Sequence, residues 1–418
     1  MKLFTAALAL LALGFSPAQD ARKPNVVLIL ADDLGAECLG SYGSTSYKTP
    51  HLDALARSGL RFENAFCTPL CSPSRVQLMT GRYGFRTGWT QLIEAEGDEF
   101  LNPQKEKTFG HLLKAAGYAT GIAGKWQLCH FDKHPDHLRE CGFDESCMWT
   151  WQWEGKRSSR YWDPSVWQNG KMLPGTDGKY GPDIFSDFAC DFIRRHKDKP
   201  FFFYYPMALV HDPFVATPDS KEGKKAKGNK VFPDMVAYMD KIVGKIVATL
   251  DECKLRENTL LIFTGDNGTT KGVPSQVGDK TVIGGKSTMK DTGSHVPLIV
   301  SWPGTAPAGK VLDDMVDFTD VIPTLCDLTG AKLPGAPTDG RSFAEQIRGR
   351  KGTPREWVFV QLGKNRFVRD QRWKLHSDGK LFDIKKDPEE TQPFAGESEP
   401  ADAAAARKRF EEVLSKLR

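Results

Sequence analysis

Residues 25–33 read NVVLILADD, and this stretch decides the fold class. Its NVVLILA part is a continuous apolar run rich in β-branched residues, which is typical of a strand buried on both faces. Further strands are predicted at 120–123, 201–205, 259–264 and 297–302. Helices are predicted at 50–58, 108–116 and 236–250. Strands that alternate with helices predict an α/β fold, in which helices sandwich a large and mostly parallel sheet.

The composition changes over residues 331–355, which are rich in glycine, proline, lysine and arginine. Beyond this segment lie short strand candidates at 357–361, 366–369, 373–376 and 381–384, and a helix candidate at 401–417. We therefore expect an α/β domain over residues 19–335 and a smaller C-terminal subdomain over residues 336–418. The subdomain is expected to combine a small antiparallel sheet with a helix.

The N-terminus has the pattern of a secretory signal peptide. Lys2 precedes an apolar run at 3–15, and the small residues at 16–18 follow it. The run is too short to span a bilayer, and an uncleaved anchor is the alternative. We expect residues 1–18 to be a signal peptide and the mature protein to be exported, to the periplasm or the medium.

Composition and charge exclude several classes of protein. The 418 residues are 40% hydrophobic and 26% charged, as in ordinary globular proteins. The formal charge, 57 − 53 = +4, is too balanced to predict nucleic acid or an anionic membrane as the main partner. The longest apolar run of the mature chain, at 201–210, suits a buried strand and not a membrane span. The nine cysteines are an odd number, so at least one is unpaired or chemically special.

Two pairs of oxygen-bearing side chains follow predicted strands. Asp32 and Asp33 come directly after the first strand, and Asp266 and Asn267 follow the strand at 259–264. In open α/β sheets, ligands bind beyond the carboxyl ends of the strands. Carboxylate and amide oxygens suit hard cations, so these residues predict a site for Ca²⁺ or Mg²⁺. For either pair alone, ordinary turn chemistry is the alternative.

The motif CSPSR at residues 71–75 precedes a predicted helix that ends at Gly81. Ser72 suits the N-cap and Pro73 suits the first helical position. Cys71 would then face the positive end of the helix dipole, which lowers the pKa of a thiol and attracts anions. A buried or disulfide-bonded structural cysteine is the alternative.

Six motifs run in order through nearly the whole mature chain. They are KPNVVLILADDLG (23–35), TPHLDALARSGLRFENAF (49–66), CSPSRVQLMTGR (71–82), GYATGIAGKW (117–126), TGDNG (264–268) and LFDIKKDPEE (381–390). With these motifs the chain resembles the type I sulfatases of the alkaline-phosphatase superfamily. C-x-P-x-R with a following T-G-R is highly specific, and A-D-D and D-N-G add to the match.

The resemblance implies a particular nucleophile. In that family a maturation enzyme oxidises the motif cysteine to formylglycine, so Cys71 would carry this change. One hydroxyl of the hydrated aldehyde attacks sulfur, and deprotonation of the other then expels the sulfate and restores the aldehyde. A serine would be left as a stable sulfate ester. Without Cys71 eight cysteines remain, which is an even number.

The resemblance also assigns roles to other residues by motif. It implies a calcium site, with Ca²⁺ favoured over Mg²⁺, formed by Asp32, Asp33, Asp266, Asn267 and the diol derived from Cys71. It implies contacts to the diol, the sulfate or the leaving group for Arg75, Lys125, His211 and Lys286. Taken singly, the lysines would be surface charges and the histidine a structural one.

Two positions depart from the family pattern, and the tryptophan-rich stretch is a separate feature. Gln127 occupies the place of the usual histidine after G-K-W; it can hydrogen-bond the diol but carries no proton at neutral pH. The sequence TGSH at 292–295 replaces the usual G-G-V-R, which affects substrate-side contacts. The five tryptophans within 148–167 predict either a loop that stacks on a sugar or aryl group, or a strand with one face in the core.

The sequence thus predicts an exported, calcium-dependent sulfatase that hydrolyses sulfate monoesters, with carbohydrate sulfates favoured over simple aryl sulfates. An arylsulfatase is one alternative. A phosphate or phosphonate ester hydrolase of the same superfamily is another, although it would ordinarily carry serine or threonine as nucleophile and a histidine-rich second metal site. A non-catalytic sulfoglycan-binding homologue is the third, and Gln127 motivates it.

Overall fold

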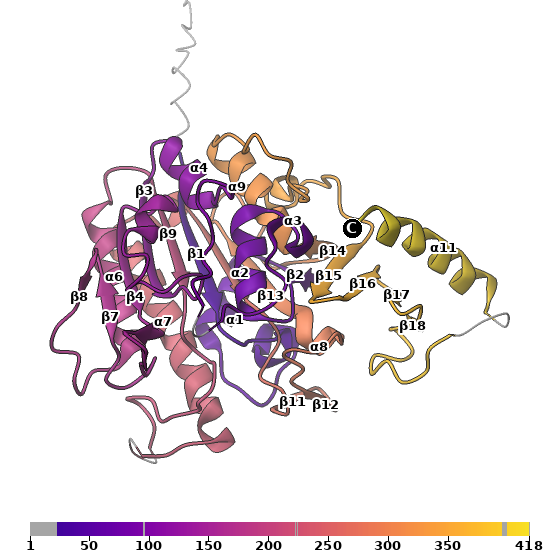
Figure 1. The fold of residues 1–418 in the computed structure, drawn as a ribbon, viewed down its shortest axis with the longest axis horizontal. Coiled ribbons are helices and arrows are strands. Elements are labelled where there is room, and N and C mark those ends of the chain that lie inside the picture. Colours follow the sequence, from indigo (N-terminus) through magenta and orange to yellow (C-terminus); the bar gives the residue numbers. More distant parts are fainter. Residues whose placement is uncertain (1–22, 95–96, 222, 224, 395–398, 418) are drawn as a thin grey trace, which may run out of the picture.

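The computed structural model describes residues 23–94, 97–221, 223, 225–394 and 399–417 (Figure 1). The predicted signal peptide at 1–18 lies outside these residues. The described chain forms a ten-stranded sheet flanked by helices, and a separate four-stranded sheet near the C-terminus. The predicted fold class, a large and mostly parallel sheet with a smaller antiparallel one, is confirmed.

The large sheet has the strand order β14-β2-β13-β10-β1-β9-β3-β4-β7-β8. Its strands are β1 (Asn25–Ala31), β2 (Leu60–Phe66), β3 (Ala119–Lys125), β4 (Glu145–Trp149), β7 (Val166–Gln168), β8 (Lys171–Met172), β9 (Phe201–Pro206), β10 (Thr259–Gly265), β13 (His295–Ser301) and β14 (Lys310–Asp317). The central strands β10, β1, β9, β3 and β4 are parallel to one another. Antiparallel pairing begins at β13 on one side and at β7 on the other.

Strand β1 lies in the middle of this sheet and explains the apolar run in the sequence. It pairs with β10 along one edge and with β9 along the other, and all its residues are buried. Val27 and Ile29 belong to one hydrophobic core, whereas Val26 and Leu28 belong to the core on the opposite face. A strand covered on both faces is rich in apolar side chains. Its one polar residue, Asn25, is hydrogen-bonded: Nδ2 donates to Thr259 Oγ1 at 3.4 Å and Oδ1 accepts from the Phe201 N–H at 3.3 Å.

Helices cover both faces of the large sheet. One core contains residues of α1 (Pro50–Ser58), α6 (Gly181–Arg195) and α7 (Phe232–Glu252). The other contains residues of α2 (Cys71–Thr80), α4 (Phe109–Ala115) and α9 (Val321–Thr329). Across the described residues, no helix is both long enough and apolar enough to cross a bilayer.

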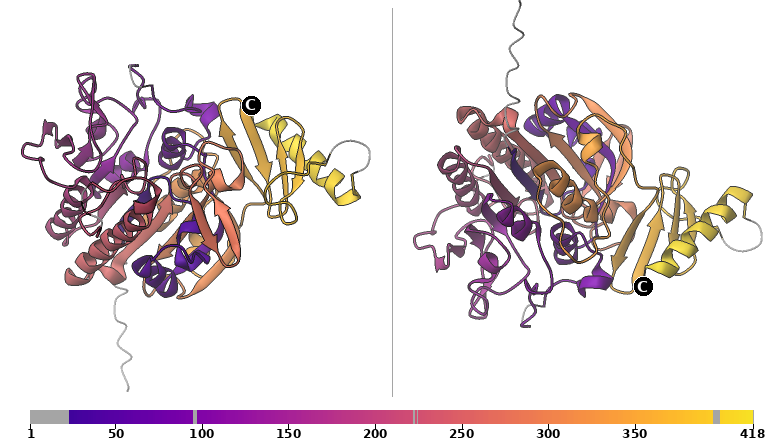
Figure 2. Two further views of the ribbon diagram at one scale, coloured as in Figure 1. Left: turned by 90° about the horizontal axis from the view of Figure 1, so that it is seen from below. Right: turned by 90° about the horizontal axis from the view of Figure 1, so that it is seen from above.

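The C-terminal part forms a small sheet with its own core. The sheet has the antiparallel order β15 (Val358–Leu362), β16 (Asn365–Arg369), β17 (Trp373–His376) and β18 (Leu381–Asp383), close to the predicted strands. Phe410 of α11 (Ala401–Lys416) packs in one cluster with Val368 and Leu375 of the sheet. In both views of Figure 2 this sheet and α11 stand beside the main body.

Shorter elements fill the connections. They are α3 (Gly84–Thr87), α5 (His137–Glu140), β5 (Gln152–Trp153), β6 (Lys156–Arg157), β11 (Pro274–Val277), β12 (Lys280–Ile283), α8 (Asp291–Ser294) and α10 (Ala344–Ile347). The tryptophan-rich stretch is not one continuous strand, because β4 ends at Trp149 and the β5–β6 hairpin follows it. Trp149 and Trp167 are buried, whereas Trp151 and Trp153 are half-buried.

A buried lysine joins the small sheet to the main body. Lys374 of β17 has no solvent exposure, and its Nζ donates to Met289 O at 2.7 Å, Asp291 Oδ1 at 3.1 Å and Glu390 Oε1 at 2.6 Å. Arg369 of β16 also pairs with Asp291. Met289 lies between β12 and α8, and Asp291 is the first residue of α8. The C-terminal sheet therefore anchors the start of α8 and the segment before it.

Candidate active site

The ends of neighbouring parallel strands bring the predicted site residues together. Asp32 and Asp33 follow β1, Asp266 and Asn267 follow β10, and Lys125 is the last residue of β3. Because β10, β1, β9 and β3 are parallel, their carboxyl ends meet at one edge of the sheet. The Asp33 backbone N–H donates to Asp266 Oδ1 at 3.0 Å, and Asn267 Nδ2 donates to Asp33 Oδ1 at 2.8 Å. The two acidic pairs thus form one buried cluster.

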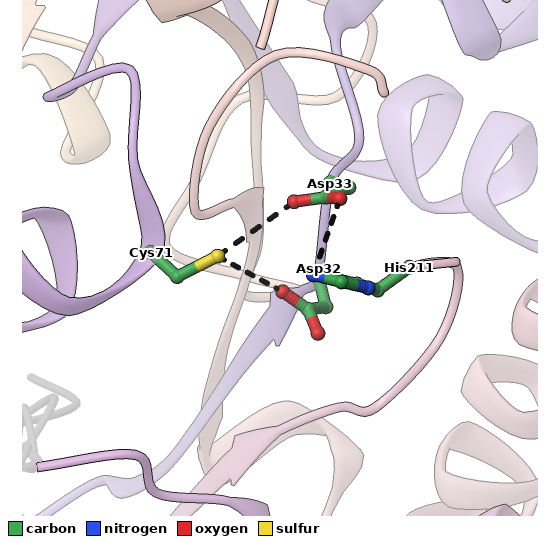
Figure 3. A group of neighbouring side chains, drawn as sticks. All are labelled: Asp32, Asp33, Cys71 and His211. Carbon is green, nitrogen blue, oxygen red and sulfur yellow. Dashed lines mark hydrogen bonds and ion pairs between the residues drawn. The ribbon is translucent and has the colours of Figure 1, made fainter. Parts of the chain in front are cut away.

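Cys71 lies against this cluster at the start of α2. Its Sγ is 3.6 Å from Asp32 Oδ1 and 3.7 Å from Asp33 Oδ1. Figure 3 shows the thiol pointing at the two aspartates from one side, with His211 on the other. Cys71 is buried and forms no disulfide, and burial raises the pKa of its thiol to about 12. The unmodified side chain is therefore a neutral thiol at pH 7.

The start of α2 differs from the prediction. The helix begins at Cys71, and its first bond runs from the Ser74 N–H to the Leu70 carbonyl at 3.1 Å, so Ser72 is not the N-cap. Pro73 is tolerated there because the first helical turn leaves its N–H groups without intrahelical partners. The Ser72 hydroxyl instead donates to the Gln127 carbonyl at 3.2 Å. Cys71 thus belongs to the first turn of the helix and does not precede it.

Three cations surround Asp32. Lys125 Nζ lies 2.8 Å and 2.9 Å from its two carboxylate oxygens, and Arg160 Nη1 lies 2.8 Å from Oδ2. Arg75 is 3.4 Å away and binds Asp266 more closely, at 2.7 Å. Burial alone would raise the pKa of Asp32, but these charges, with Lys125 the strongest, hold it well below its usual value. Asp32 therefore stays ionised at neutral pH.

Asp33 has its own set of partners. Lys286 Nζ donates to Asp33 Oδ2 at 2.7 Å, and Thr270 Oγ1 donates to the same oxygen at 3.1 Å. His211 Nε2 lies 3.7 Å from Asp33 Oδ2. Burial acts to raise the pKa of Asp33, and the charges of His211 and Lys286 overcome it and lower the pKa. All the residues expected to contact the sulfate thus lie around one point.

The donor set fits a hard divalent cation. Ligand atoms of Asp32, Asp33, Cys71 and His211 all lie within 4.8 Å of one another. The side-chain oxygen Oδ1 of Asn267 is buried and has no hydrogen-bond partner within the described part of the chain. The carboxylates of Asp32 and Asp33 and the free amide oxygen of Asn267 are typical ligands of Ca²⁺.

Comparison with known proteins assigns the family. The family model described as Sulfatase matches residues 24–331. The chain belongs to the sulfatase family. A second model, described as the C-terminal part of N-sulphoglucosamine sulphohydrolase, matches residues 283–418 of this sulfatase. The family assignment makes the chain a sulfuric ester hydrolase.

Several relatives are similar over most of this sulfatase. The N-acetylgalactosamine-6-sulfatase of the dog is 31% identical, over 85% of this chain and 72% of its own. An N-acetylgalactosamine-6-O-sulfatase of Bacteroides thetaiotaomicron is 30% identical, over 85% and 83%. A solved sulfatase from the glycosaminoglycan metabolism of B. thetaiotaomicron has 26% identity and a TM-score of 0.80, over 95% of this chain and 99% of that one.

Gln127, Ser294 and His295, where this sulfatase departs from the family pattern, lie in different parts of the structure. Gln127 has a left-handed backbone, with φ of 57°, and its Oε1 is buried without a partner among the described residues. Ser294 is fully buried behind Cys67, whose backbone N–H donates to the Ser294 carbonyl at 2.9 Å. His295 Nε2 lies 2.7 Å from the Glu63 carbonyl, in β13 rather than in the acidic cluster. Gln127 thus adjoins α2, through Ser72.

Sequence reasoning missed two residues that contact the acidic cluster, Thr270 and Arg160. Arg160 lies in the connection between β6 and β7, outside every quoted motif, and contacts Asp32 directly. The signal for Arg160 in the sequence is its place within the tryptophan-rich stretch. In the structure its guanidinium carbon lies 4.5 Å from the centre of the ring of Trp149, a residue of that stretch.

Proposed function

We propose that this sulfatase hydrolyses sulfate monoesters of carbohydrates, with an oxidised Cys71 as nucleophile and a calcium ion as cofactor. The observation that carries the proposal is the position of Cys71, which is buried between two aspartates and surrounded by cations at the end of β1. The names of the relatives support a sulfated sugar as substrate, because two of them are N-acetylgalactosamine-6-sulfatases.

Calcium would be held by Asp32, Asp33, Asp266, Asn267 and residue 71. Bound there, it supplies positive charge beside the sulfate group. The chain prepares this site by fixing its ligands: Arg75 holds Asp266 through Nε at 3.1 Å and Nη2 at 2.7 Å. The Asp33 N–H bonded to Asp266 joins the two strand ends. Formylglycine, once formed from Cys71, supplies a hydrated aldehyde as the nucleophile.

The chain's own cations account for sulfate binding. Lys125 has no solvent exposure, whereas the Lys286 side chain is 13% exposed and that of His211 is 16% exposed. Lys125 therefore lies at the floor of the site and the other two lie toward solvent. Preorganised cations of this kind stabilise the charge that develops on a sulfate during transfer. His211 is also placed to give a proton to the leaving oxygen or to take one from the nucleophile.

His211 and Gln127 are expected to contribute unequally to catalysis. Gln127→Ala removes at most one neutral hydrogen bond, which costs no more than about tenfold. His211→Ala removes the imidazole beside Asp33 that is placed to give or take a proton in catalysis, which costs about 10²–10⁴-fold. Single-turnover sulfate release by the two variants on one substrate makes the comparison. If Gln127→Ala proved as damaging as His211→Ala, the division of roles would be wrong.

We also propose that the protein is exported and that the catalytic domain covers residues 19–335. The apolar N-terminus of the sequence supports export. The four-stranded sheet and α11 share a core, to which Tyr83 of the main body also contributes, and this core supports a C-terminal subdomain at 336–418. Its connection to the active site is Lys374, which binds the segment that follows Lys286.

Desulfation of defined substrates tests the proposed function. Protein matured in a host that makes formylglycine should release sulfate from at least one sulfated monosaccharide or oligosaccharide, faster than from an aryl sulfate. Chelation of calcium should stop the release, and calcium should restore it. Faster turnover of phosphate or phosphonate esters would contradict the proposal. Binding of sulfated glycans without any sulfate release would instead favour a non-catalytic role.

A further inference from the structure

Arg160 lies beside Lys125 and has no role in the function proposed above. Lys125 Nζ and Arg160 Nη1 both donate to Oδ2 of Asp32, at 2.9 Å and 2.8 Å. Two nitrogen atoms that share one oxygen are close enough to share another anionic oxygen group. Lys125 is the residue that the proposed function places against the sulfate, so Arg160 lies next to the sulfate position.

The surroundings of Arg160 fix its guanidinium. The group stacks on the Trp149 ring, with 4.5 Å between the guanidinium carbon and the ring centre. The next residue, Tyr161, is buried, and its hydroxyl donates to the Ala208 carbonyl at 3.0 Å and to the His211 carbonyl. The loop that carries Arg160 is thereby attached to the loop that carries His211. Both side chains are slightly exposed, Arg160 at 10% and His211 at 16%.

The Arg160 guanidinium has N–H donors that bind no other group of the described residues. Its side chain is 10% exposed, and its one hydrogen bond to a described residue is the bond to Asp32. The guanidinium has five N–H groups in a planar fork, which match two oxygens of a tetrahedral anion. A stacked guanidinium loses little further freedom when it binds such an anion.

We propose that Arg160 binds the sulfate group that is cleaved, beside Lys125. This inference rests on the proposed function and adds a substrate-binding residue to it. Arg160 carries a permanent charge and transfers no proton, so its contribution is to sulfate binding and to stabilising charge in the transition state. It thus supplies fixed charge in a site where Gln127 replaces the usual histidine.

Inorganic sulfate is the probe that separates this role from others. In Arg160→Gln, the inhibition constant of sulfate should rise about tenfold to a hundredfold, the range for loss of a charged hydrogen bond. The value of kcat/KM should fall on a monosulfated neutral sugar and on an aryl sulfate alike. Arg160→Lys should show a smaller rise, because lysine keeps the charge but loses the fork. Arg157→Gln, an exposed residue of β6, is the matched control and should behave as wild type.

Three results would overturn the inference. The first is an unchanged sulfate inhibition constant in Arg160→Gln or, should that variant not fold, in Arg160→Lys. The second is a loss confined to substrates that carry another acidic group, which would place Arg160 on that group. The third is weakened calcium binding with unchanged sulfate binding, which would make Arg160 a positioning residue for Asp32. A wild-type protein that releases no sulfate would instead overturn the proposed function, and sulfate binding by calorimetry would still test Arg160.

Discussion

Serine in place of Cys71 is expected to abolish repeated turnover and to leave the protein folded. Serine is close to cysteine in size, and the site around residue 71 is formed by Asp32 and Asp33, which the change does not touch. A serine has one oxygen, so a sulfate transferred to it has no second hydroxyl to expel it. At most one sulfate per molecule should be transferred.

The measurement is sulfate and alcohol release over time, with thermal unfolding as the check on folding. Cys253→Ser, at a half-buried cysteine just after α7, is the matched control and should keep wild-type turnover. Continued turnover by Cys71→Ser at a rate near that of the wild type would show that residue 71 is not the nucleophile.

Asp266→Asn is expected to remove calcium binding and activity together. Asparagine has one acceptor oxygen in place of the two that Asp266 presents to the Asp33 N–H and to Arg75, so thermal unfolding is measured as a check on the fold. The site also loses one negative charge. Mutating groups that only orient a metal ligand costs about 10–100-fold in affinity. Loss of a ligand's charge should therefore weaken calcium binding by more than about a hundredfold. Burial raises the pKa of Asp266, and the charge of Arg75 opposes this rise.

Calorimetric titration with calcium measures this effect without relying on activity. Asp279→Asn, an exposed aspartate in the turn between β11 and β12, is the control and should bind calcium as the wild type does. An Asp266→Asn protein that bound calcium normally and turned over at the wild-type rate would show that Asp266 is not a ligand.

The core of the fold could be predicted because its strands are buried on both faces. Residues 26–31 of β1 are apolar throughout, and β9 and β10 show the same uniform burial. Strands β2 and β14 were not predicted, because they are not buried on both faces along their whole length. The LRFENAF of β2 mixes buried and half-exposed positions, and β14 is an edge strand with three aspartates, whose first half is largely exposed. Charged residues are common on edge strands, so the apolar pattern that marks a strand is missing there.

The site was predictable where its residues lie in short motifs at strand ends. Asp32, Asp33, Asp266 and Asn267 meet because parallel strands end at one edge of the sheet. The start of α2 was predicted too late in the chain, because Ser72 and Pro73 have a helix-start pattern of their own. In the structure the hydrogen bond from the Ser74 N–H to the Leu70 carbonyl already belongs to the helix, which therefore begins at Cys71. Arg160 was not predictable, because a single arginine in a loop gains its position only through the tertiary contacts of Trp149 and Tyr161.

The most direct test of the central claim is the chemical state of residue 71 in protein of known activity. Trypsin releases the peptide 62–75, which contains Cys71 and also Cys67 as an internal reference thiol. Preparations with different degrees of maturation are analysed by mass spectrometry for the aldehyde or its hydrate at residue 71, and their turnover is measured in parallel. Turnover per molecule should rise in proportion to the fraction of formylglycine and vanish when that fraction is zero. Full turnover in protein that carries only a thiol at residue 71, or a disulfide to Cys67, would contradict the account.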